Sequence, residues 1–390
     1  MILHDTIRDL ATFHSSGNCA ISFYYQPQTP QDKSHRSEAI QAKDLLRTAM
    51  RNAERDGANG NARADFERIM EIAEHLHGNH ARGKAIFACG SQNFWREFDL
   101  PPRLGESRVF VGRRFHIRPL AFLGETLSRF CAVVLDRTRA RFFELELDEV
   151  LEGEPMSHHL PRRGRSDGWR GFDAGHAERH VDHEAMHFLK QVADRLLERQ
   201  ESGVERFLIG CREELWPEIE PHLHPYVTQR LVGRFHLDPS LVTPEEIRGI
   251  ADQAMSKHAA TRRRELVREA TGQAKRDSRG ALGVGRVLLA LETGEAQSIL
   301  LANTFASPGV QCANCGHLEA ESKSECALCR RPVTELEDIS DALIWQAMQR
   351  GVEVVAVSDE PELSELTHAG GLAALLRFRA DQNTEQRKAG

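Results

Sequence analysis

The sequence predicts an α/β protein with three domains, and three observations lead to this prediction. The chain has 390 residues, which is too many for one ordinary hydrophobic core. Short segments rich in β-branched and aromatic residues alternate with segments of helical periodicity, near the start of the chain and near its end. A long charged helical pattern lies between these blocks. We predict an N-terminal domain at 1–122, a middle domain at 123–270, a C-terminal domain at 271–380 and a flexible tail at 381–390.

The N-terminal domain is predicted to be an α/β domain with a long helical hairpin. Helical patterns cover 33–56 and 62–80, and the segment "DGANGN" separates them. Its Asp-Gly and Asn-Gly pairs favour a tight polar turn. A short helix within "DTIRDLATF" and a strand at 18–25 precede this hairpin. Further strands are expected at 84–90, 93–100 and 107–112.

The middle domain opens with a predicted β-hairpin, "FCAVVLDRTRARFFELELDEV", which turns at Asp136–Arg137–Thr138 and is followed by a third short strand. A loop rich in Gly, Arg and His runs from 154 to 175, and a helix is expected at 176–200. After the strand "RFLIGC", a long charged helix begins at the Thr-Pro-Glu-Glu segment 243–246, which is typical of a helix cap.

The C-terminal domain alternates helix and strand, which indicates a compact α/β sandwich. Helices are expected at 284–294, 339–351 and 362–371, and strands at 296–303, 352–358 and 372–378.

Composition and charge limit the class of protein. With 40% apolar residues and a net charge of −7, the chain is typical of a soluble globular protein, and a protein that wraps naked nucleic acid with its whole surface is excluded. No window approaches the ~18 consecutive apolar residues of a membrane span, and the N-terminus lacks the apolar run of a signal peptide. We therefore expect a cytoplasmic protein without a membrane partner. The four scattered cysteines lie in apolar contexts and are interpreted as reduced core residues: Cys19, Cys89, Cys131 and Cys211.

The other four cysteines predict a metal site. Cys312 and Cys315 form one C-x2-C pair, and Cys326 and Cys329 form a second pair ten residues later. Two such knuckles place four thiolates tetrahedrally around one Zn²⁺, and without an open position the site would be structural. A redox pair or free thiols are the alternative, although a redox C-x2-C is normally single and begins a helix. Because the segment 311–332 interrupts the C-terminal domain, we predict a zinc-ribbon insert rather than an independent finger.

Positive charge gathers at three places on this acidic chain. Eight Lys or Arg residues stand against three acidic residues between Lys257 and Arg279, and "RRGR" at 162–165 and "RVFVGRRFHIRP" at 108–119 are also basic. Each cluster alone can be a solvated helix face or loop. Together the three clusters indicate a protein that touches a structured RNA at selected points.

Four histidines follow the spacing i, i+4, i+7, i+11 on the predicted helix of the middle domain: His176, His180, His183 and His187. At about 100° per residue they lie within about 60° of one another, opposite the apolar residues of the helix. Three interpretations stay open, namely a solvated face, an RNA-facing stripe, and a metal site at His176 and His180 with Glu184 or His183. The RNA-facing stripe would lie beside Arg162, Arg163, Arg165, Trp169 and Arg170.

Motifs in all three parts resemble one protein family. The cysteine insert and "VEVVAVSDEPELSELTHAGGLAALLRF" resemble the C-terminal domain of archaeo-eukaryotic class-1 peptide release factors and Pelota, which has an L7Ae-like fold. The segment "AIFACGSQNFWREFDLPPRLGESRVFVGRRFHIRPL" resembles the end of their N-terminal domain, with its Gly-Arg-Arg turn, and "CAVVLDRTRARFFELEL" resembles the ribonuclease-H-like start of their middle domain. The order of these motifs is most similar to the bacterial archaeo-eukaryotic release factor family.

This resemblance makes two missing motifs informative. Release factors of this type carry a Gly-Gly-Gln loop before the long helix of the middle domain, which coordinates the water that attacks peptidyl-tRNA. Here that loop reads "RRGRSDGWRGFDAGH". The Asn-Ile-Lys-Ser tetrapeptide linked to stop-codon reading is also missing, although Asn61 and Arg63 occupy a similar place at the hairpin tip. We therefore expect neither peptidyl-tRNA hydrolysis nor codon-specific termination.

The resemblance implies a ribosome-associated translation factor that binds the A site in ribosome rescue or hibernation. Its partners would be the ribosome, through rRNA and tRNA, and a translational GTPase. Besides the loop arginines, Trp169 and the four histidines, the candidate RNA contacts are Asn61, Arg63, Arg113 and Arg114.

An enzymatic function is the alternative, and it would be a hydrolase or nuclease that uses the middle domain. We assign no catalytic residue and do not expect an enzyme, because the strand carboxylates form no constellation that suits two-metal chemistry. These carboxylates are Asp136, Glu144, Glu146 and Asp148.

Overall fold

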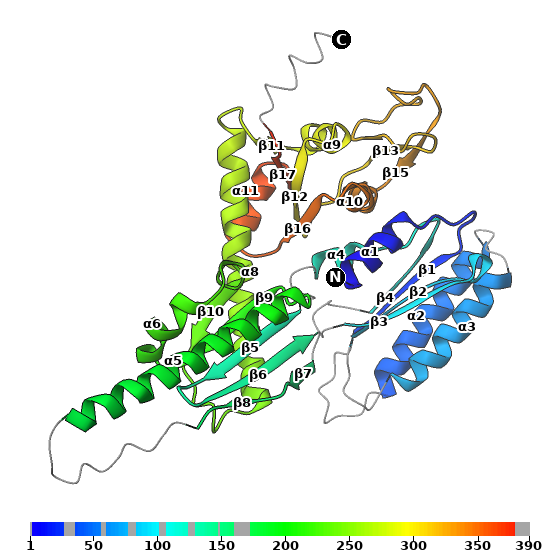
Figure 1. Cartoon of the computed structure of the whole chain (residues 1–390). Helices are drawn as coiled ribbons and strands as arrows, with labels where there is room; N and C mark the ends of the chain where they lie inside the picture. The colour runs from blue at the N-terminus through cyan, green and yellow to red at the C-terminus, as the bar shows by residue number, and fades with distance from the viewer. Residues whose placement is uncertain are drawn as a thin grey trace. The chain divides into compact units, whose positions relative to one another are not determined.

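Figure 1 shows the computed structural model of the protein. The structure describes residues 2–26, 36–55, 60–76, 83–100, 107–123, 129–146, 149–159 and 172–378. The chain divides into two compact units, one made of Met1–Gly124 with Ala260–Gly390 and the other of Glu125–Ala259. The three predicted domains differ from these two units, since the predicted middle domain extends to residue 270, and they stay a prediction. The predicted tail at 381–390 lies outside the described residues.

The first unit opens with a four-stranded antiparallel sheet in the order β3-β2-β1-β4. The predicted helical hairpin is confirmed as α2 and α3, which lie side by side in Figure 1 and share a core with the sheet. The elements of this part are α1 (Ile2–Thr12), β1 (Ala20–Tyr25), α2 (Arg36–Arg55), α3 (Gly60–His75), β2 (Gly83–Cys89), the 3-10 turn η1 (Gly90–Gln92), β3 (Phe94–Leu100), β4 (Arg108–Gly112) and α4 (Arg118–Phe122).

All six residues of β1 are buried because both faces of this central strand are covered. Phe23 and Tyr25 belong to the core that α2 and α3 complete. Since side chains alternate along a strand, Tyr24 points to the opposite face, where its ring meets Phe87 edge-on at 5.7 Å. Its hydroxyl donates to the backbone oxygen of His116 at 2.5 Å.

The second unit is built on a mixed sheet in the order β10-β9-β5-β6-β7, and β8 also pairs with β6. Strand β5 runs parallel to β9 and antiparallel to β6, and β9 runs parallel to β10. The strands are β5 (Phe130–Leu135), β6 (Arg139–Glu146), β7 (Glu149–Glu152), β8 (Met156–Ser157), β9 (Arg206–Gly210) and β10 (Leu231–Phe235). The helices are α5 (Phe172–Glu201), η2 (Glu213–Leu215), α6 (Trp216–Ile219), η3 (Glu220–His222), α7 (Pro225–Thr228) and the first part of α8 (Pro244–Ala274).

The predicted hairpin of the middle part is confirmed as β5 and β6, and the predicted third strand as β7. Its turn depends on Asp136, whose Oδ1 accepts the backbone N–H groups of Thr138 and Arg139 at 2.6 and 2.8 Å. An aspartate that bonds its own backbone two residues on is a common way to fix a turn.

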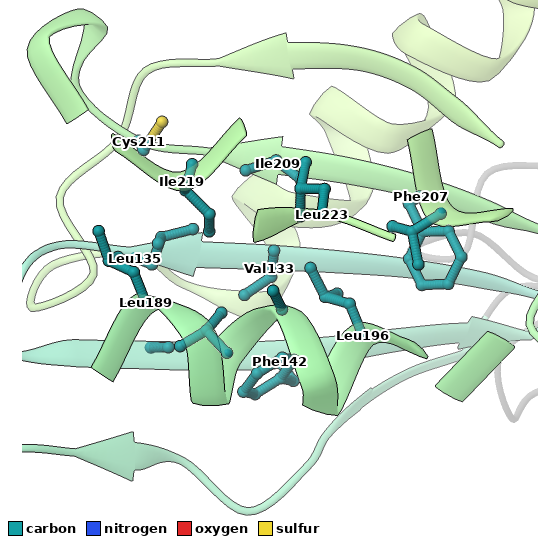
Figure 2. Close-up of a cluster of buried hydrophobic side chains, with 14 of the residues drawn as sticks. Val133, Leu135, Phe142, Leu189, Leu196, Phe207, Ile209, Cys211, Ile219 and Leu223 are labelled. Atoms are coloured by element: carbon teal, nitrogen blue, oxygen red, sulfur yellow. The ribbon is translucent and has the colours of Figure 1, made fainter. Parts of the chain in front are cut away.

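The sheet of the second unit is covered on both faces. On one face, Leu189 and Leu196 of α5 lie over Val133 of β5 and Phe142 of β6, as Figure 2 shows. On the other face, Ile247 near the start of α8 packs in a second cluster. Two covered faces explain why β5 is buried at all six residues and has a continuous apolar sequence.

Helix α5 begins at Phe172, inside the segment 154–175 that the sequence predicts as a loop. Strand β8 also lies in that segment. Gly175 lowers helix propensity just before the predicted start, which explains why the sequence pattern favours a later beginning. The predicted cap of α8 is confirmed, because Thr243 and Glu246 bond each other's backbone N–H groups at 3.3 and 2.9 Å.

The C-terminal part of the first unit contains a four-stranded sheet in the order β11-β17-β12-β16. Strands β12 and β16 are parallel, and the other pairs are antiparallel. Between β12 and α10 the chain forms a second, three-stranded sheet in the order β14-β13-β15. The elements are β11 (Gly280–Leu282), α9 (Val284–Glu292), β12 (Ala296–Ala302), β13 (Gly309–Cys312), β14 (Leu318–Glu319), β15 (Val333–Leu336), α10 (Ser340–Gln349), β16 (Glu353–Val357), α11 (Glu362–His368) and β17 (Leu372–Leu376).

Within the first unit, Arg118 at the start of α4 joins the two parts of the chain. Its guanidinium donates to the backbone oxygens of Asn303 and Phe305 at 2.9 and 3.1 Å and to the hydroxyl of Ser340 at 3.0 Å. Nearby, the indole N–H of Trp345 donates to a backbone oxygen of the N-terminal part at 2.9 Å. These bonds hold the start of α10 against the segment that follows β4.

Among the described helices, none combines the length and the apolar content that a membrane span requires.

Replacing Arg118 with Ala should lower the free energy of unfolding of the first unit by about 1–3 kcal/mol, because three acceptors, two of them in partly buried hydrogen bonds, would lose a charged donor. Urea unfolding followed by circular dichroism measures this loss. Arg113→Ala is the matched control, since Arg113 is exposed and its side chain has no partner among the described residues. An equal loss in both variants would contradict the role given to Arg118.

Candidate metal centre and candidate RNA-binding residues

The four cysteines predicted as metal ligands lie together at one end of the three-stranded sheet. The Sγ atoms of Cys312, Cys315, Cys326 and Cys329 all lie within 4.8 Å of one another. Two of the sulfur–sulfur distances are 3.4 Å, for Cys312 and Cys329, and 3.5 Å, for Cys315 and Cys326. Among the residues that the structure describes, this is the one group whose ligand atoms come close enough to hold a metal ion.

Two knuckles with matching backbone hydrogen bonds position these sulfurs. Cys312 donates its N–H to the oxygen of His317 at 2.9 Å, and its own oxygen accepts the N–H of Gly316 at 2.9 Å. Cys326 makes the same two bonds with the residues five and four positions further along, at 2.8 and 3.0 Å. The two C-x2-C segments therefore have the same local fold.

Both knuckles need a left-handed residue directly after their second cysteine. In the first knuckle this residue is Gly316, with φ +76°, and in the second it is Arg330, with φ +59°. Glycine adopts such a conformation freely, whereas a residue with a side chain pays about 1 kcal/mol or more. The sequence analysis missed this feature, although the glycine after Cys315 is a signal for it.

Backbone N–H groups also tune the thiols. The N–H of Cys315 lowers the pKa of Cys312, and the N–H of Arg331 lowers the pKa of Cys329 to about 6. The N–H of His317 acts in the same direction on Cys315, but burial and the neighbouring thiols raise the pKa of Cys315 to about 12. Backbone donors thus lower the pKa of Cys312 and of Cys329, and a bound cation would favour the thiolate form of all four cysteines.

This donor set fits a tetrahedral zinc ion. Four sulfurs at ~2.3 Å from one ion lie ~3.8 Å from one another. Two of the observed separations, 3.4 and 3.5 Å, are slightly shorter than this value, and no pair is more than 4.8 Å apart. Four protein ligands leave no open position for substrate or water, so the group fits a structural ion.

The metal centre is attached to the body of the C-terminal part. The ring of His317 bonds the carboxylate of Glu292 in α9 at 2.8 Å, and Gln346 of α10 donates to the backbone oxygen of Gly316. Leu318, which follows His317 in the chain, is buried. The cysteine segment is therefore an insert packed on two helices, as the sequence predicts, and not a free-standing finger.

The candidate RNA-binding residues occur in several separate places. Arg63 is exposed and pairs with Glu67 at 3.1 Å, and Arg113 is exposed. Arg114 is half-buried, with its guanidinium 5.0 Å from the ring of Trp345, and burial lowers its pKa. The remaining candidates of the loop and the hairpin tip lie outside the residues whose side chains are described: Asn61, Arg162, Arg163, Arg165, Trp169 and Arg170.

Three of the four predicted histidines, His180, His183 and His187, are exposed on α5. The side chain of His176 is not among those described. The carboxylate of Glu184 lies 3.8 Å from the ring of His180 and 3.2 Å from that of His158. An outward-facing stripe is confirmed for the described three, and its role in binding RNA stays a prediction.

Two of the strand carboxylates considered for enzymatic chemistry have structural partners. Asp136 fixes the hairpin turn, and Glu144 pairs with Arg129 at 3.3 Å and with Arg199 at 3.4 Å. The side chains of Glu146 and Asp148 lie outside the described residues.

The four scattered cysteines are free and buried, as predicted. Burial raises the pKa of Cys131 to about 12 and that of Cys211 to about 11, which keeps both thiols protonated and unreactive. Cys19, directly before β1, and Cys89, the last residue of β2, have their sulfurs 3.4 Å apart.

The fold and the cysteine cluster thus define a multidomain α/β protein with an insert whose four cysteines could hold a metal ion. Residues 116–259 match the family model described as bacterial archaeo-eukaryotic release factor family 10. The release-factor-like resemblance predicted from the sequence is therefore confirmed, and the family model places it on the middle stretch of the chain. A comparison with curated proteins gives no match.

The chain is only distantly similar to solved structures. Pelota from Archaeoglobus fulgidus is 13% identical, with 97% of this chain and 92% of that chain covered and a TM-score of 0.36. Dom34 from S. cerevisiae is 12% identical over 76% of this chain and 80% of its own, with a TM-score of 0.42. The C-terminal domain of a peptide chain release factor from Methanosarcina mazei is 24% identical, covers 37% of this chain and 98% of that chain, and has a TM-score of 0.28.

Replacing Cys329 with Ser should lower the zinc content of the purified protein from about one ion per chain to a small fraction, because a structural site needs all four thiolates. Inductively coupled plasma mass spectrometry measures the content. Cys211→Ser is the matched control, since this buried thiol lies outside the metal cluster. Absence of zinc from the wild-type protein, or full retention in Cys329→Ser, would contradict the site.

Replacing Arg330 with Gly should tighten zinc binding by up to about fivefold, because it removes roughly 1 kcal/mol of backbone strain. The reciprocal change, Gly316→Ala, should weaken binding by a similar factor, since it introduces the same strain into the first knuckle. Competition with a chromophoric chelator measures both affinities. Shifts of the same sign in the two variants would show that backbone conformation does not control the site.

Proposed function

We propose that this protein is a ribosome-associated translation factor of the release-factor type, which binds the A site in rescue or hibernation without hydrolysing peptidyl-tRNA. The family match over residues 116–259 carries the proposal. Within that stretch the loop "RRGRSDGWRGF" has no Gly-Gly-Gln, the motif that the resemblance associates with hydrolysis. The absence of this motif supports binding without peptide release.

On the same resemblance, the partners would be rRNA and tRNA of the ribosome and a translational GTPase, and the protein would act in the cytoplasm. The exposure of Arg63, Arg113 and the described histidines of α5 supports contacts with RNA, because cationic and imidazole groups at a surface can meet phosphates and bases. The salt bridge of Arg63 is exposed, so such a pair gives way to a phosphate at little energetic cost.

We propose that the metal is one structural Zn²⁺ held by Cys312, Cys315, Cys326 and Cys329. When bound, the ion links the two knuckles and takes no part in a reaction. Because the insert has few apolar residues, metal binding would supply most of its folding free energy, on the order of 10–16 kcal/mol.

The hydrolase or nuclease alternative has less support. Oδ1 of Asp136 accepts backbone N–H groups of the hairpin turn, and Glu144 pairs with Arg129 and Arg199, so a structural role accounts for both carboxylates.

Sucrose-gradient sedimentation of the tagged protein tests the proposed function. The protein should travel with ribosomal particles in growing or in starved cells, because RNA contacts at several points give affinity at physiological salt. A protein that stays at the top of the gradient in both states would overturn the proposal.

A peptide-release assay on ribosomes that carry peptidyl-tRNA separates binding from hydrolysis. The wild-type protein should release no more peptide than a sample without factor. The double change Asp167→Gly with Trp169→Gln, which introduces the missing motif, should increase release. Efficient release by the wild-type protein would contradict the non-hydrolytic function.

A further inference from the structure

A group of basic residues at the end of α8 has not been accounted for by the metal centre or by the family match. Lys275 and Arg276 belong to the chain just past the last residue of α8, Arg279 precedes β11, and Arg377 follows β17. All four are exposed. We call these four residues the terminal basic patch.

Backbone contacts bring the three segments of the terminal basic patch together. Gly280 pairs with Leu375, and the N–H of Leu376 donates to the oxygen of Arg279 at 3.1 Å, so Arg279 and Arg377 lie at the same end of two neighbouring strands. A Cβ at Gly280 would lie 2.4 Å from backbone atoms of Ala270 and Ala274, which shows how closely β11 approaches the last turns of α8. Figure 1 shows β11 and β17 beside this end of α8.

The arginines earlier in α8 are used differently. Arg262 bonds Glu353 at 2.6 Å, Arg263 bonds Asp359 at 3.0 Å, and Arg264 bonds Glu362 at 2.8 Å. These three pairs fasten the helix to the C-terminal part. In contrast, no side chain of the terminal basic patch forms an ion pair with any residue that the structure describes.

Helix electrostatics explains only half of the terminal basic patch. Lys275 and Arg276 lie at the C-terminus of α8, where the helix dipole favours cations by roughly 0.3–1 kcal/mol each. Arg279 and Arg377 lie on strand ends, where no such dipole acts. Four neighbouring cations repel one another, and the only acidic residue inserted among them in the sequence is Asp277. Their arrangement therefore favours an external polyanion.

We propose that the terminal basic patch binds the phosphate backbone of RNA and that Phe378 stacks on an adjacent base. This inference rests on the proposed function and deepens it, because it assigns an RNA contact to the C-terminal part of the chain. Guanidinium groups bind phosphate oxygens in bidentate fashion, which suits arginines spaced along a surface. Phe378 follows Arg377 directly and is 38% exposed. Proteins that bind single-stranded RNA combine cationic side chains with exposed aromatic rings in this way. An acidic protein would interact with the cationic side chains, but it has no bases on which the ring of Phe378 could stack.

Fluorescence anisotropy of the full-length protein with a labelled RNA hairpin that has a single-stranded tail tests this proposal, between about 50 and 200 mM salt. The patch variant combines Lys275→Gln, Arg279→Gln and Arg377→Gln. The matched control combines Lys323→Gln, Arg139→Gln and Arg212→Gln, which removes the same charge and the same residue types from dispersed, exposed positions outside the patch. Circular dichroism confirms that both variants keep the fold.

The patch variant should bind the RNA at least about tenfold more weakly than the wild-type protein. Its plot of log affinity against log salt should lose about 2–3 from the slope, at ~0.7–0.9 for each phosphate contact. The control should lose less than about 1. Equal behaviour of the two variants, or a wild-type protein without RNA affinity, would overturn the proposal. Displacement of the RNA by polyglutamate as readily as by unlabelled RNA would overturn it too, because the surface would then bind acidic protein.

The two proposals can fail separately. If the wild-type protein sediments with ribosomes but the patch variant binds RNA like the control, the terminal basic patch is wrong and the proposed function stands. If the wild-type protein never sediments with ribosomes and the patch variant still loses RNA affinity selectively, the proposed function is wrong and the patch stands.

Discussion

Burial of the central strands on both faces is the constraint from which the rest of the structure follows. Every residue of β1 and of β5 is buried, so each strand needs a layer of side chains above and below it. In the first unit α2 and α3 cover one face and an aromatic cluster around Phe115 covers the other. In the second unit α5 and the start of α8 supply the two layers. The positions of these helices, and of the side chains that they present to solvent, are consequences of this requirement.

Elements with strong local signals could be predicted from the sequence. The apolar run of β5, the aspartate turn at Asp136, the helical hairpin and the Thr243 cap all depend on residues close together in the chain. The shorter elements α4, β10 and β11 could not be predicted, because so few residues carry little local pattern, and β11 pairs with a strand more than 90 positions further along. Arg118 illustrates this limit, since its acceptors lie about 200 positions further along and no sequence pattern links them.

The candidate metal centre also has features that could be predicted from the sequence and features that could not. Two C-x2-C pairs are enough to predict the four ligands, because the chemistry of zinc fixes their type and spacing. The contact of the first knuckle with α9 and α10 could not be foreseen, since it depends on how His317 and Gln346 are presented by the folded chain. The candidate RNA-binding residues are predictable only as clusters of charge. Which arginines are already occupied, as Arg262 is by Glu353, is decided by tertiary packing.

The close packing around Gly280 limits which residues this position can accept during evolution. Backbone atoms of α8 occupy the space where a Cβ at position 280 would lie. Because these atoms belong to the main chain, a second substitution elsewhere cannot make room for a larger residue. An exposed residue nearby can be replaced without moving the backbone. A larger residue at position 280 would push β11 away from α8 and shift its pairing with β17. The pairing of β11 with β17 therefore depends on glycine at position 280, whose side chain is a single hydrogen atom.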